Sequence, residues 1–430
     1  MRHLPILRHG VVYRSLDIRT LRAPDTETPL AEVSLANAGL IRRDARRPPS
    51  LEFQPKAIAQ ALERAAELLY APIGLDPDAS PMDLAEFKTV VEKSTGLSEA
   101  VITHQLALLA ETLQGLAQRV PETQPAQVRD LAVVLPSNAL AVNRAWLPAI
   151  ALGARVALKP GAADPFTPHR LIAALIAGGI PRETFSIYPS DHETTGVLIG
   201  TSSRTQLFGD ASVVERYSHD PNVQVNGPGR SAVILAAGLD WTAHLDDLIE
   251  GVCLHSGRSC LNTSSIVTLD GPETAKRLAN ALAERLKSAP RVNLGDPAKV
   301  RAIAARVEDA LLTVGAQRLS PDGFGTPTPH PSAPDQSSLA PTVIHCESGS
   351  HPLARIELPF PFVSVTSVEE QAVLSWLGPT LAVATLGVST ALERAIEANH
   401  DIERLCPSAP HSLSTSMAET HLERMRGLLS

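Results

Sequence analysis

Hydrophobic positions along this chain recur with a helical period in its first third. Between residues 55 and 69 they are three or four residues apart, which predicts an amphipathic helix with a buried face of Ile58, Leu62, Ala65 and Leu69. Residues 83–120 show a similar pattern, and Gly96 stands where a break between two helices is expected. Residues 1–50 are expected to be irregular or to form short strands.

The pattern changes after residue 130 to short apolar runs that end in turn residues. These runs predict four buried strands: LAVVLPSN (131–138), RVALKPG (155–161), FSIYPS (185–190) and TQLFGD (205–210). Helical segments at residues 140–152 and 168–177 lie between the first three of these strands. Strand–helix–strand alternation of this length predicts a parallel, doubly wound sheet. Such sheets bind ligands at the carboxyl ends of their strands.

A second series of strands and helices follows the turn NGPGR. Strands are expected at 231–236, 264–269, 341–346 and 360–365, and helices at 243–254, 273–288 and 298–314. Residues 319–342 are rich in Pro and Ser, which predicts a surface loop. We therefore expect an α/β chain with three parts: N-terminal helices and a nucleotide-binding domain over 1–228, a catalytic domain over 229–405, and a C-terminal tail over 406–430.

Composition narrows the possible functions. The net charge of −8 gives no sign of a nucleic-acid partner. No apolar stretch reaches the roughly 18 residues that span a bilayer, and the N-terminus has no signal-peptide core. Four cysteines without paired spacing make no disulfide framework, so a cytoplasmic location is expected. The stretch HCESGSH (345–351) has no zinc-ligand spacing, and we expect no metal site there.

Two polar residues follow the first two predicted strands. Asn138 could donate its amide N–H to a developing oxyanion, and Lys159 could reach ribose hydroxyls or a phosphate. A turn-forming Asn and a Lys that extends its ammonium to solvent are the alternatives for these two residues. No G-x-G-x-x-G or P-loop accompanies them.

Cys260 ends the loop HSGRSC (255–260), where a thiol can face a pocket. The two glycines of NGPGR permit a close approach of backbones. The other cysteines, Cys253, Cys346 and Cys406, are expected to be small buried hydrophobic residues.

Six segments in this order resemble the motifs of the aldehyde dehydrogenase superfamily. That superfamily has P-W-N-F-P, V-x-K-P, F-T-G-S, E-L-G-G-K-S-P, G-Q-x-C and E-x-F-G-P. This chain has PSNAL, ALKPG, LFGD, NGPGRSA, GRSC and ELPFP, within residues 131–395. The resemblance implies a doubly wound cofactor domain joined to a second, catalytic α/β domain, with the active site in the cleft between them.

The resemblance also implies a role for each matched residue. Cys260 would be the thiol nucleophile, and Asn138 with the backbone N–H of Cys260 would form the oxyanion hole. Lys159 would hold the adenosine ribose of NAD or NADP, and Glu357 the ribose next to nicotinamide. Gly209 would lie beside the cofactor.

Two departures bear on the reaction. Asn226 stands where the superfamily has its general-base glutamate, and an amide cannot take a proton from water. Members that exchange acyl groups with CoA also lack this glutamate, so the expected substrate is an aldehyde or an acyl thioester, with CoA as a candidate partner. Asp210 stands where the superfamily has Ser beside the pyrophosphate, and its charge would repel phosphate. The alternative is a non-catalytic relative that serves as a binding or assembly module; whether the chain forms a homo-oligomer stays open.

Overall fold

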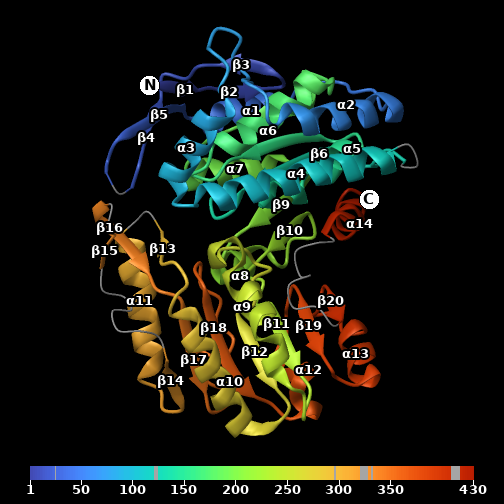
Figure 1. Cartoon of the computed structure of the whole chain (residues 1–430). Coiled ribbons are helices and arrows are strands. Elements are labelled where there is room, and N and C mark those ends of the chain that lie inside the picture. Colours follow the sequence, from blue (N-terminus) through green and yellow to red (C-terminus); the bar gives the residue numbers. More distant parts are fainter. Residues whose placement is uncertain (25, 121–123, 295–296, 320–327, 331–332, 408–416) are drawn as a thin grey trace. The chain divides into compact units, whose positions relative to one another are not determined.

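The structure is a computed structural model of the whole chain, and it describes all residues except 25, 121–123, 295–296, 320–327, 331–332 and 408–416. The chain folds into two compact units. Unit 1 contains residues 1–227 and 417–430, and unit 2 contains residues 228–416. Each unit has its own central sheet and its own helices (Figure 1).

A seven-stranded sheet in the order β10-β9-β6-β7-β8-β2-β3 forms the centre of unit 1. Its first five strands are parallel: β6 (Asp130–Val134), β7 (Arg155–Lys159), β8 (Phe185–Ile187), β9 (Arg204–Phe208) and β10 (Val223–Asn226). The pair β2 (Ile6–Arg8) and β3 (Val11–Tyr13) extends the β8 edge in antiparallel fashion. The chain runs from β6 outward to β8 and then returns to β9 on the other side of β6. The sheet is therefore doubly wound, as the alternation predicted.

Helices and a small second sheet complete unit 1. The helices are α1 (Ala38–Ala45), α2 (Pro55–Leu68), α3 (Leu84–Thr95), α4 (Glu99–Arg119), α5 (Leu147–Ala151), α6 (Phe166–Gly178), α7 (His192–Thr201) and α8 (Ala211–Tyr217). The second sheet has the order β1-β5-β4, from Arg2–Leu4, Pro29–Ser34 and Ile18–Arg22. α2 packs on α4 and α6 through the buried face that its apolar spacing predicted. α3 ends at Gly96, whose φ of 72° is one that glycine adopts without strain.

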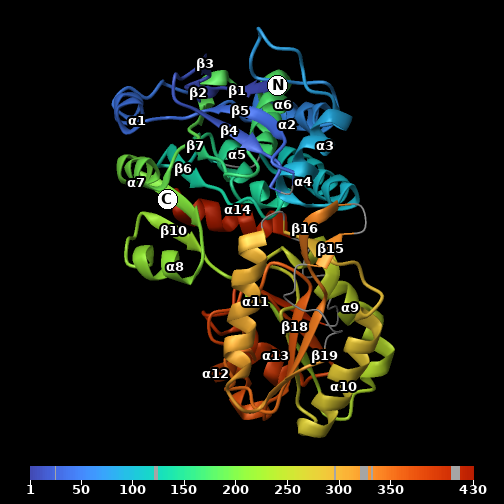
Figure 2. The same cartoon turned by 90° about the vertical axis from the view of Figure 1, so that its left-hand side faces the viewer.

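The last helix, α14 (Met417–Leu428), also belongs to unit 1. It packs against α4 and α5 (Figures 1 and 2). Its Leu422 and Met425 are buried in the hydrophobic core that also contains residues of α4 and α5. The sequence pattern predicts only a tail over residues 406–430, so this helix is an element that it does not reveal. No helix in the described part of the chain is both long and apolar enough to cross a bilayer.

Unit 2 has a second seven-stranded sheet in the order β14-β17-β18-β12-β11-β19-β20. All its strands are parallel except β14, and they are β11 (Ala232–Leu235), β12 (Ser265–Thr268), β14 (Ala316–Arg318), β17 (Thr342–Cys346), β18 (Phe362–Ser367), β19 (Val383–Leu386) and β20 (Leu405–Pro407). The helices are α9 (Leu245–Cys253), α10 (Gly271–Leu286), α11 (Pro297–Leu311), α12 (Val373–Leu377) and α13 (Thr390–Glu397). α10 packs against β17 and β18.

One predicted loop contains strands instead. Residues 319–342 were expected to be irregular, but β15 (Thr328–His330) and β16 (Ala333–Leu339) form an antiparallel sheet with β13 (Val292–Asn293). Residues 320–327 and 331–332 of that stretch lie outside the described residues. Strand pairing uses backbone groups, so a Pro- and Ser-rich composition did not prevent it.

Candidate active site

Three of the predicted site residues lie at one edge of the unit 1 sheet. Lys159 is the last residue of β7, Gly209 directly follows β9, and Asn138 lies in a bend shortly after β6. These strands are neighbours, because Val134 of β6 pairs with both Lys159 and Leu207. The strand order reverses at β6, and this is where doubly wound sheets bind their ligands.

The loops after β6 and β7 pack so closely that they form one structure. A Cβ on Gly161 would lie 2.2 Å from Ser137 Oγ and 2.5 Å from the Pro136 carbonyl oxygen. The backbone N–H of Ala163 donates to Ser137 Oγ at 3.0 Å. The backbone beside Asn138 is therefore held against the loop that follows Lys159.

Lys159 is half-buried and makes no ion pair with any residue that the structure describes. Burial lowers the pKa of its ammonium, and the nearby guanidinium of Arg19 lowers it further. An unpaired ammonium at the carboxyl end of a strand is suited to hold hydroxyls or an anion.

The turn after β9 differs from a simple phosphate-binding turn. A Cβ on Gly209 would lie 2.5 Å from Val213 Cβ, so a larger residue does not fit there. Asp210 caps α8: its Oδ1 accepts from the hydroxyl of Ser212 at 2.6 Å and from the backbone N–H groups of Ser212 and Val213 at 3.0 and 3.2 Å. These hydrogen bonds, that of the Ser212 side chain first, lower the pKa of Asp210. A carboxylate therefore occupies the first amides of α8.

Asn226 occupies the position at which the superfamily has its general-base glutamate, and it is the last residue of β10. Its carbonyl oxygen accepts the backbone N–H of Gly209 at 3.1 Å, and its Nδ2 lies 3.5 Å from the carbonyl oxygen of Leu207.

The other two predicted site residues lie at the amino edge of the unit 2 sheet. Cys260 precedes β12 and Glu357 precedes β18, while Gly229 and Arg230 precede β11. β11, β12 and β18 are neighbouring parallel strands, so their amino ends meet at one edge. In unit 1, by contrast, Asn138 and Lys159 lie at the carboxyl ends of their strands.

The turn before β11 holds the backbone of Cys260. A Cβ on Gly229 would lie 1.9 Å from the carbonyl oxygen of Cys260, so only glycine allows this approach. Ser231, which is fully buried, donates its hydroxyl to the same oxygen at 2.8 Å.

The loop before Cys260 bends through three consecutive residues in the left-handed region. His255, Ser256 and Gly257 have φ angles of 51°, 59° and 68°. The two non-glycine residues store strain there, which is a feature of functional loops. A Cβ on Gly257 would lie 2.2 Å from the carbonyl carbon of Phe360, so this turn packs on the segment that follows Glu357.

Asn262 joins the loop of residues 255–260, which contains Cys260, to the end of α9. No sequence pattern predicts this role. Its Oδ1 accepts the backbone N–H of Ser259 at 2.9 Å, and its Nδ2 donates to the carbonyl oxygens of Gly251 and Val252, each at 3.2 Å. The sequence shows an Asn two residues after a candidate nucleophile. It does not show that this Asn binds Gly251 and Val252, which lie 11 and 10 residues earlier.

Glu357 is tied to the same turn. Its Oε2 accepts the backbone N–H of Arg230 at 2.6 Å, and Arg230 itself has a left-handed φ of 49°. Burial raises the pKa of Glu357, and hydrogen bonds from the amides of Arg230 and Gly229 offset part of that rise. The structure thus connects Glu357 to Cys260 through Gly229, which contacts both.

The remaining thiols lie in poorly reactive surroundings. Burial raises the pKa of Cys253 to about 11 and that of Cys346 to about 12, and Cys406 is buried. Cys346 Sγ lies 3.9 Å from Nδ1 of His351, within the stretch considered for a metal. The described residues contain no group of three or more His, Cys, Asp or Glu side chains that could hold a metal ion.

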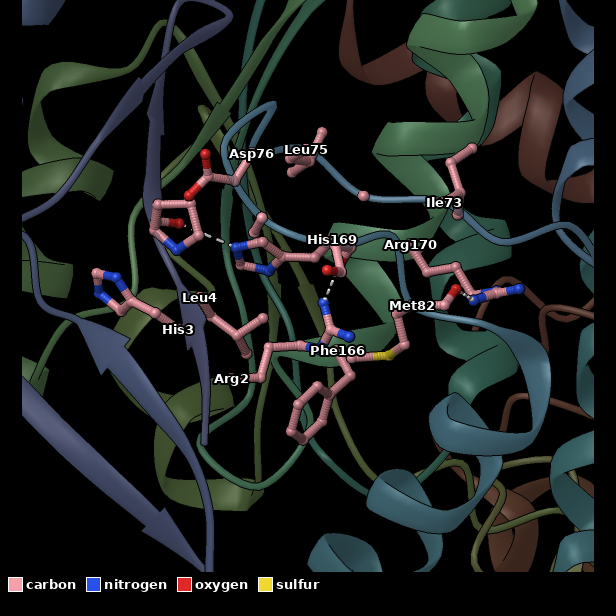
Figure 3. Close-up of a pocket in the computed structure, with 14 residues that line it drawn as sticks. Arg2, His3, Leu4, Ile73, Leu75, Asp76, Met82, Phe166, His169 and Arg170 are labelled. Atoms are coloured by element: carbon pink, nitrogen blue, oxygen red, sulfur yellow. Dashed lines mark hydrogen bonds between the residues drawn. The ribbon is translucent and has the colours of Figure 1, made fainter.

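A cavity in unit 1 lies apart from the predicted site residues. Figure 3 shows it between His3, Asp76, Phe166 and Arg170, and at its edge His169 Nε2 lies 3.0 Å from the carbonyl oxygen of Pro5, which can only accept. Its volume is about 50 Å³, far below the roughly 300–1,000 Å³ of small-molecule sites. The Arg170 guanidinium donates there to the carbonyl oxygens of Leu69, Ala71 and Met82, so it joins these backbone segments.

A model of the aldehyde dehydrogenase family matches residues 82–376, which is more than half of the chain. The chain belongs to the aldehyde dehydrogenase family. The aldehyde-dehydrogenase-like protein y4uC of Sinorhizobium fredii is 26% identical over 125 residues, which are 28% of this chain and 24% of that relative. The aligned part thus spans about a quarter of the curated relative.

Solved structures of aldehyde dehydrogenases show the same fold over nearly the whole chain. Methylmalonate-semialdehyde dehydrogenase of Oceanimonas doudoroffii has a TM-score of 0.78 at 15% identity, covering 96% of this chain and 90% of that one. An NAD+ complex of aldehyde dehydrogenase from Bacillus cereus has a TM-score of 0.76 at 13% identity, covering 94% and 88%. The expected aldehyde-dehydrogenase fold is confirmed.

Proposed function

We propose that this chain is an NAD(P)-dependent aldehyde oxidoreductase that works through a thioester on Cys260 and passes the acyl group to a thiol such as CoA. Family membership supports the general class of reaction. The observation that carries the proposal is how the backbone of Cys260 is held. Gly229 packs against its carbonyl group, Ser231 donates a hydrogen bond to the same oxygen, and a strained turn precedes it in the chain. A merely structural cysteine needs no such arrangement.

In the first step the Cys260 thiolate attacks the aldehyde carbon. A sulfur–carbon bond forms, and the carbonyl electron pair moves to the oxygen. Asn138 Nδ2 would donate to that oxyanion, a contact that contributes about 10²- to 10³-fold in rate in comparable sites.

A nicotinamide cofactor, when bound, supplies the hydride acceptor for the second step. The carboxyl edge of the unit 1 sheet fits such a molecule, because the half-buried ammonium of Lys159, which forms no ion pair with the described residues, can hold the adenosine ribose. Glu357 would accept a hydrogen bond from the other ribose. Gly209 would lie beside the cofactor at the end of β9. Asp210 fits less well, since its carboxylate already occupies the amides of α8 and would repel a pyrophosphate.

The fate of the thioester depends on the absence of a base at Asn226. Its amide cannot deprotonate water, so hydrolysis should be slow. A thiolate needs no such help: it attacks the acyl carbon, the bond to Cys260 Sγ breaks, and the enzyme thiolate leaves. Run in reverse, the same exchange loads Cys260 from an acyl-CoA for reduction to the aldehyde.

Rapid-mixing kinetics tests this proposal. Aldehyde with oxidised cofactor should give a burst of about one reduced cofactor per site and then a slow steady state, and added CoA should restore turnover. Asn226→Glu should raise turnover without thiol, while the matched Asn226→Gln should not. Rapid acid formation by the unaltered protein with no thiol present would refute the acylating reaction.

A second candidate is a non-catalytic binding or assembly module, and one observation favours it. The Asp210 carboxylate saturates the first amides of a helix beside the expected pyrophosphate. Calorimetric titration with NAD+ and NADP+ separates the two, since a module in which Asp210 fills and repels the pyrophosphate site should bind neither dinucleotide.

A further inference from the structure

A second cation lies close to Lys159 and comes from an unexpected part of the chain. Arg19 is in β4, within the N-terminal sheet that precedes the residues matched by the family model. Its Nη2 donates to the carbonyl oxygen of Ala162 at 3.0 Å, and Ala162 lies in the loop that follows Lys159. The two side chains are near enough for the charge of Arg19 to lower the pKa of Lys159.

Neither cation is neutralised by the residues around it. In the described part of the chain, neither Arg19 nor Lys159 forms an ion pair, and Arg19 Nε is buried without a hydrogen-bond partner. The acid nearest to Lys159 in sequence, Asp164, has its carboxyl buried, accepts the backbone N–H of Thr167 at 2.9 Å, and has a pKa that burial raises.

Two half-buried like charges repel each other, so this arrangement is unfavourable unless an anion joins it. Neutral ribose hydroxyls need only one donor and give no reason for a second cation. A phosphate monoester carries nearly two negative charges and accepts charge-assisted hydrogen bonds from both side chains.

We infer that Arg19 and Lys159 together bind a phosphate monoester on the ribose of an adenine nucleotide. The inference rests on the proposed function, which assigns Lys159 to the adenosine ribose. Two molecules with this chemistry fit that function: NADP(H), with a 2′-phosphate, and CoA, with a 3′-phosphate. Arg19 then determines which cofactor or acyl carrier the enzyme prefers.

Calorimetric titration of the full chain with four ligands tests this inference. NADP+ is compared with NAD+, and CoA with dephospho-CoA, so that each pair differs by the ribose phosphate alone. In at least one pair the phosphorylated ligand should bind about ten- to a hundredfold more tightly, the effect of one charge-assisted contact. Arg19→Gln should reduce this ratio to near one, and Arg19→Lys should restore part of it.

Arg22→Gln is the matched control, because Arg22 lies on the same strand and is exposed, and among the described residues its guanidinium donates to the carbonyl oxygen of Glu27 alone. It should leave all four affinities unchanged, and thermal unfolding should show that each variant is folded. Equal affinities within both pairs would overturn the inference and leave the proposed function standing. Binding of CoA over dephospho-CoA, with no binding of either dinucleotide, would support the inference and refute the cofactor assignment. Failure of all four ligands to bind would overturn both.

Discussion

Adding one methyl group at Gly229 should displace the Cys260 thiol. A Cβ there would lie 1.9 Å from the Cys260 carbonyl oxygen and 2.8 Å from its carbonyl carbon. A carbon and an oxygen need about 3.3 Å, so the two backbones must separate by roughly 1.4 Å. An error of about 1 Å at a reacting atom costs on the order of 100-fold in rate. We expect Gly229→Ala to slow the burst of reduced cofactor by at least that factor.

The control must share the loss of stability without moving Cys260. Gly238 follows β11 at the opposite edge of the same sheet, has a φ of 73°, and no atom lies within 4 Å of a Cβ built on it. Its replacement by alanine costs about 1–2 kcal/mol of backbone strain, comparable to the roughly 1–3 kcal/mol of an overpacked contact at Gly229. Both variants should therefore melt at similarly lowered temperatures, but only Gly229→Ala should lose the burst.

The assay is stopped-flow recording of reduced cofactor, with the thermal unfolding of each variant measured alongside. A Gly229→Ala protein that keeps the burst rate of the unaltered chain would show that this contact does not set the position of the thiol. A burst lost equally in Gly238→Ala would trace the effect to general instability instead.

Two substitutions and one labelling experiment test other residues. Asn138→Ala should slow the burst by about 10²- to 10³-fold with little change in cofactor affinity, and full turnover would remove this residue from the mechanism. Asp210→Ser should tighten binding of the dinucleotide by a few-fold in titrations, and the gain should shrink at high salt because the carboxylate is exposed. With pKa values raised to about 11 and about 12, Cys253 and Cys346 are deprotonated to roughly one part in 10³ and 10⁴ at pH 8. Iodoacetamide should therefore label them slowly, and faster as pH rises; rapid labelling at pH 8 would contradict their burial.

Local patterns were enough to predict the elements that carry Asn138 and Lys159. Each follows an apolar run that ends in turn residues, and parallel neighbours place such residues at one edge. The same reasoning placed Cys260 in a loop before a strand.

Contacts between distant segments could not be predicted in this way. Arg19 reaches a carbonyl oxygen 143 residues further along the chain, and Glu357 binds the backbone of a residue 127 positions earlier. Neither contact leaves a period or a motif in the sequence, because tertiary packing alone brings the partners together. The same holds for α14, whose partners lie about 300 positions earlier in α4 and α5.

Peptide mapping by mass spectrometry tests the central claim most directly. The protein is mixed with an aldehyde and oxidised cofactor, without any thiol, and is quenched in acid and digested. The peptide that contains Cys260 should gain the mass of the aldehyde less two hydrogen atoms, which is the mass of the thioester, and CoA added before the quench should remove this gain. Cys260→Ser should carry no such adduct. Sustained production of acid with Cys260 unmodified, or an acyl group on a different cysteine, would contradict the account.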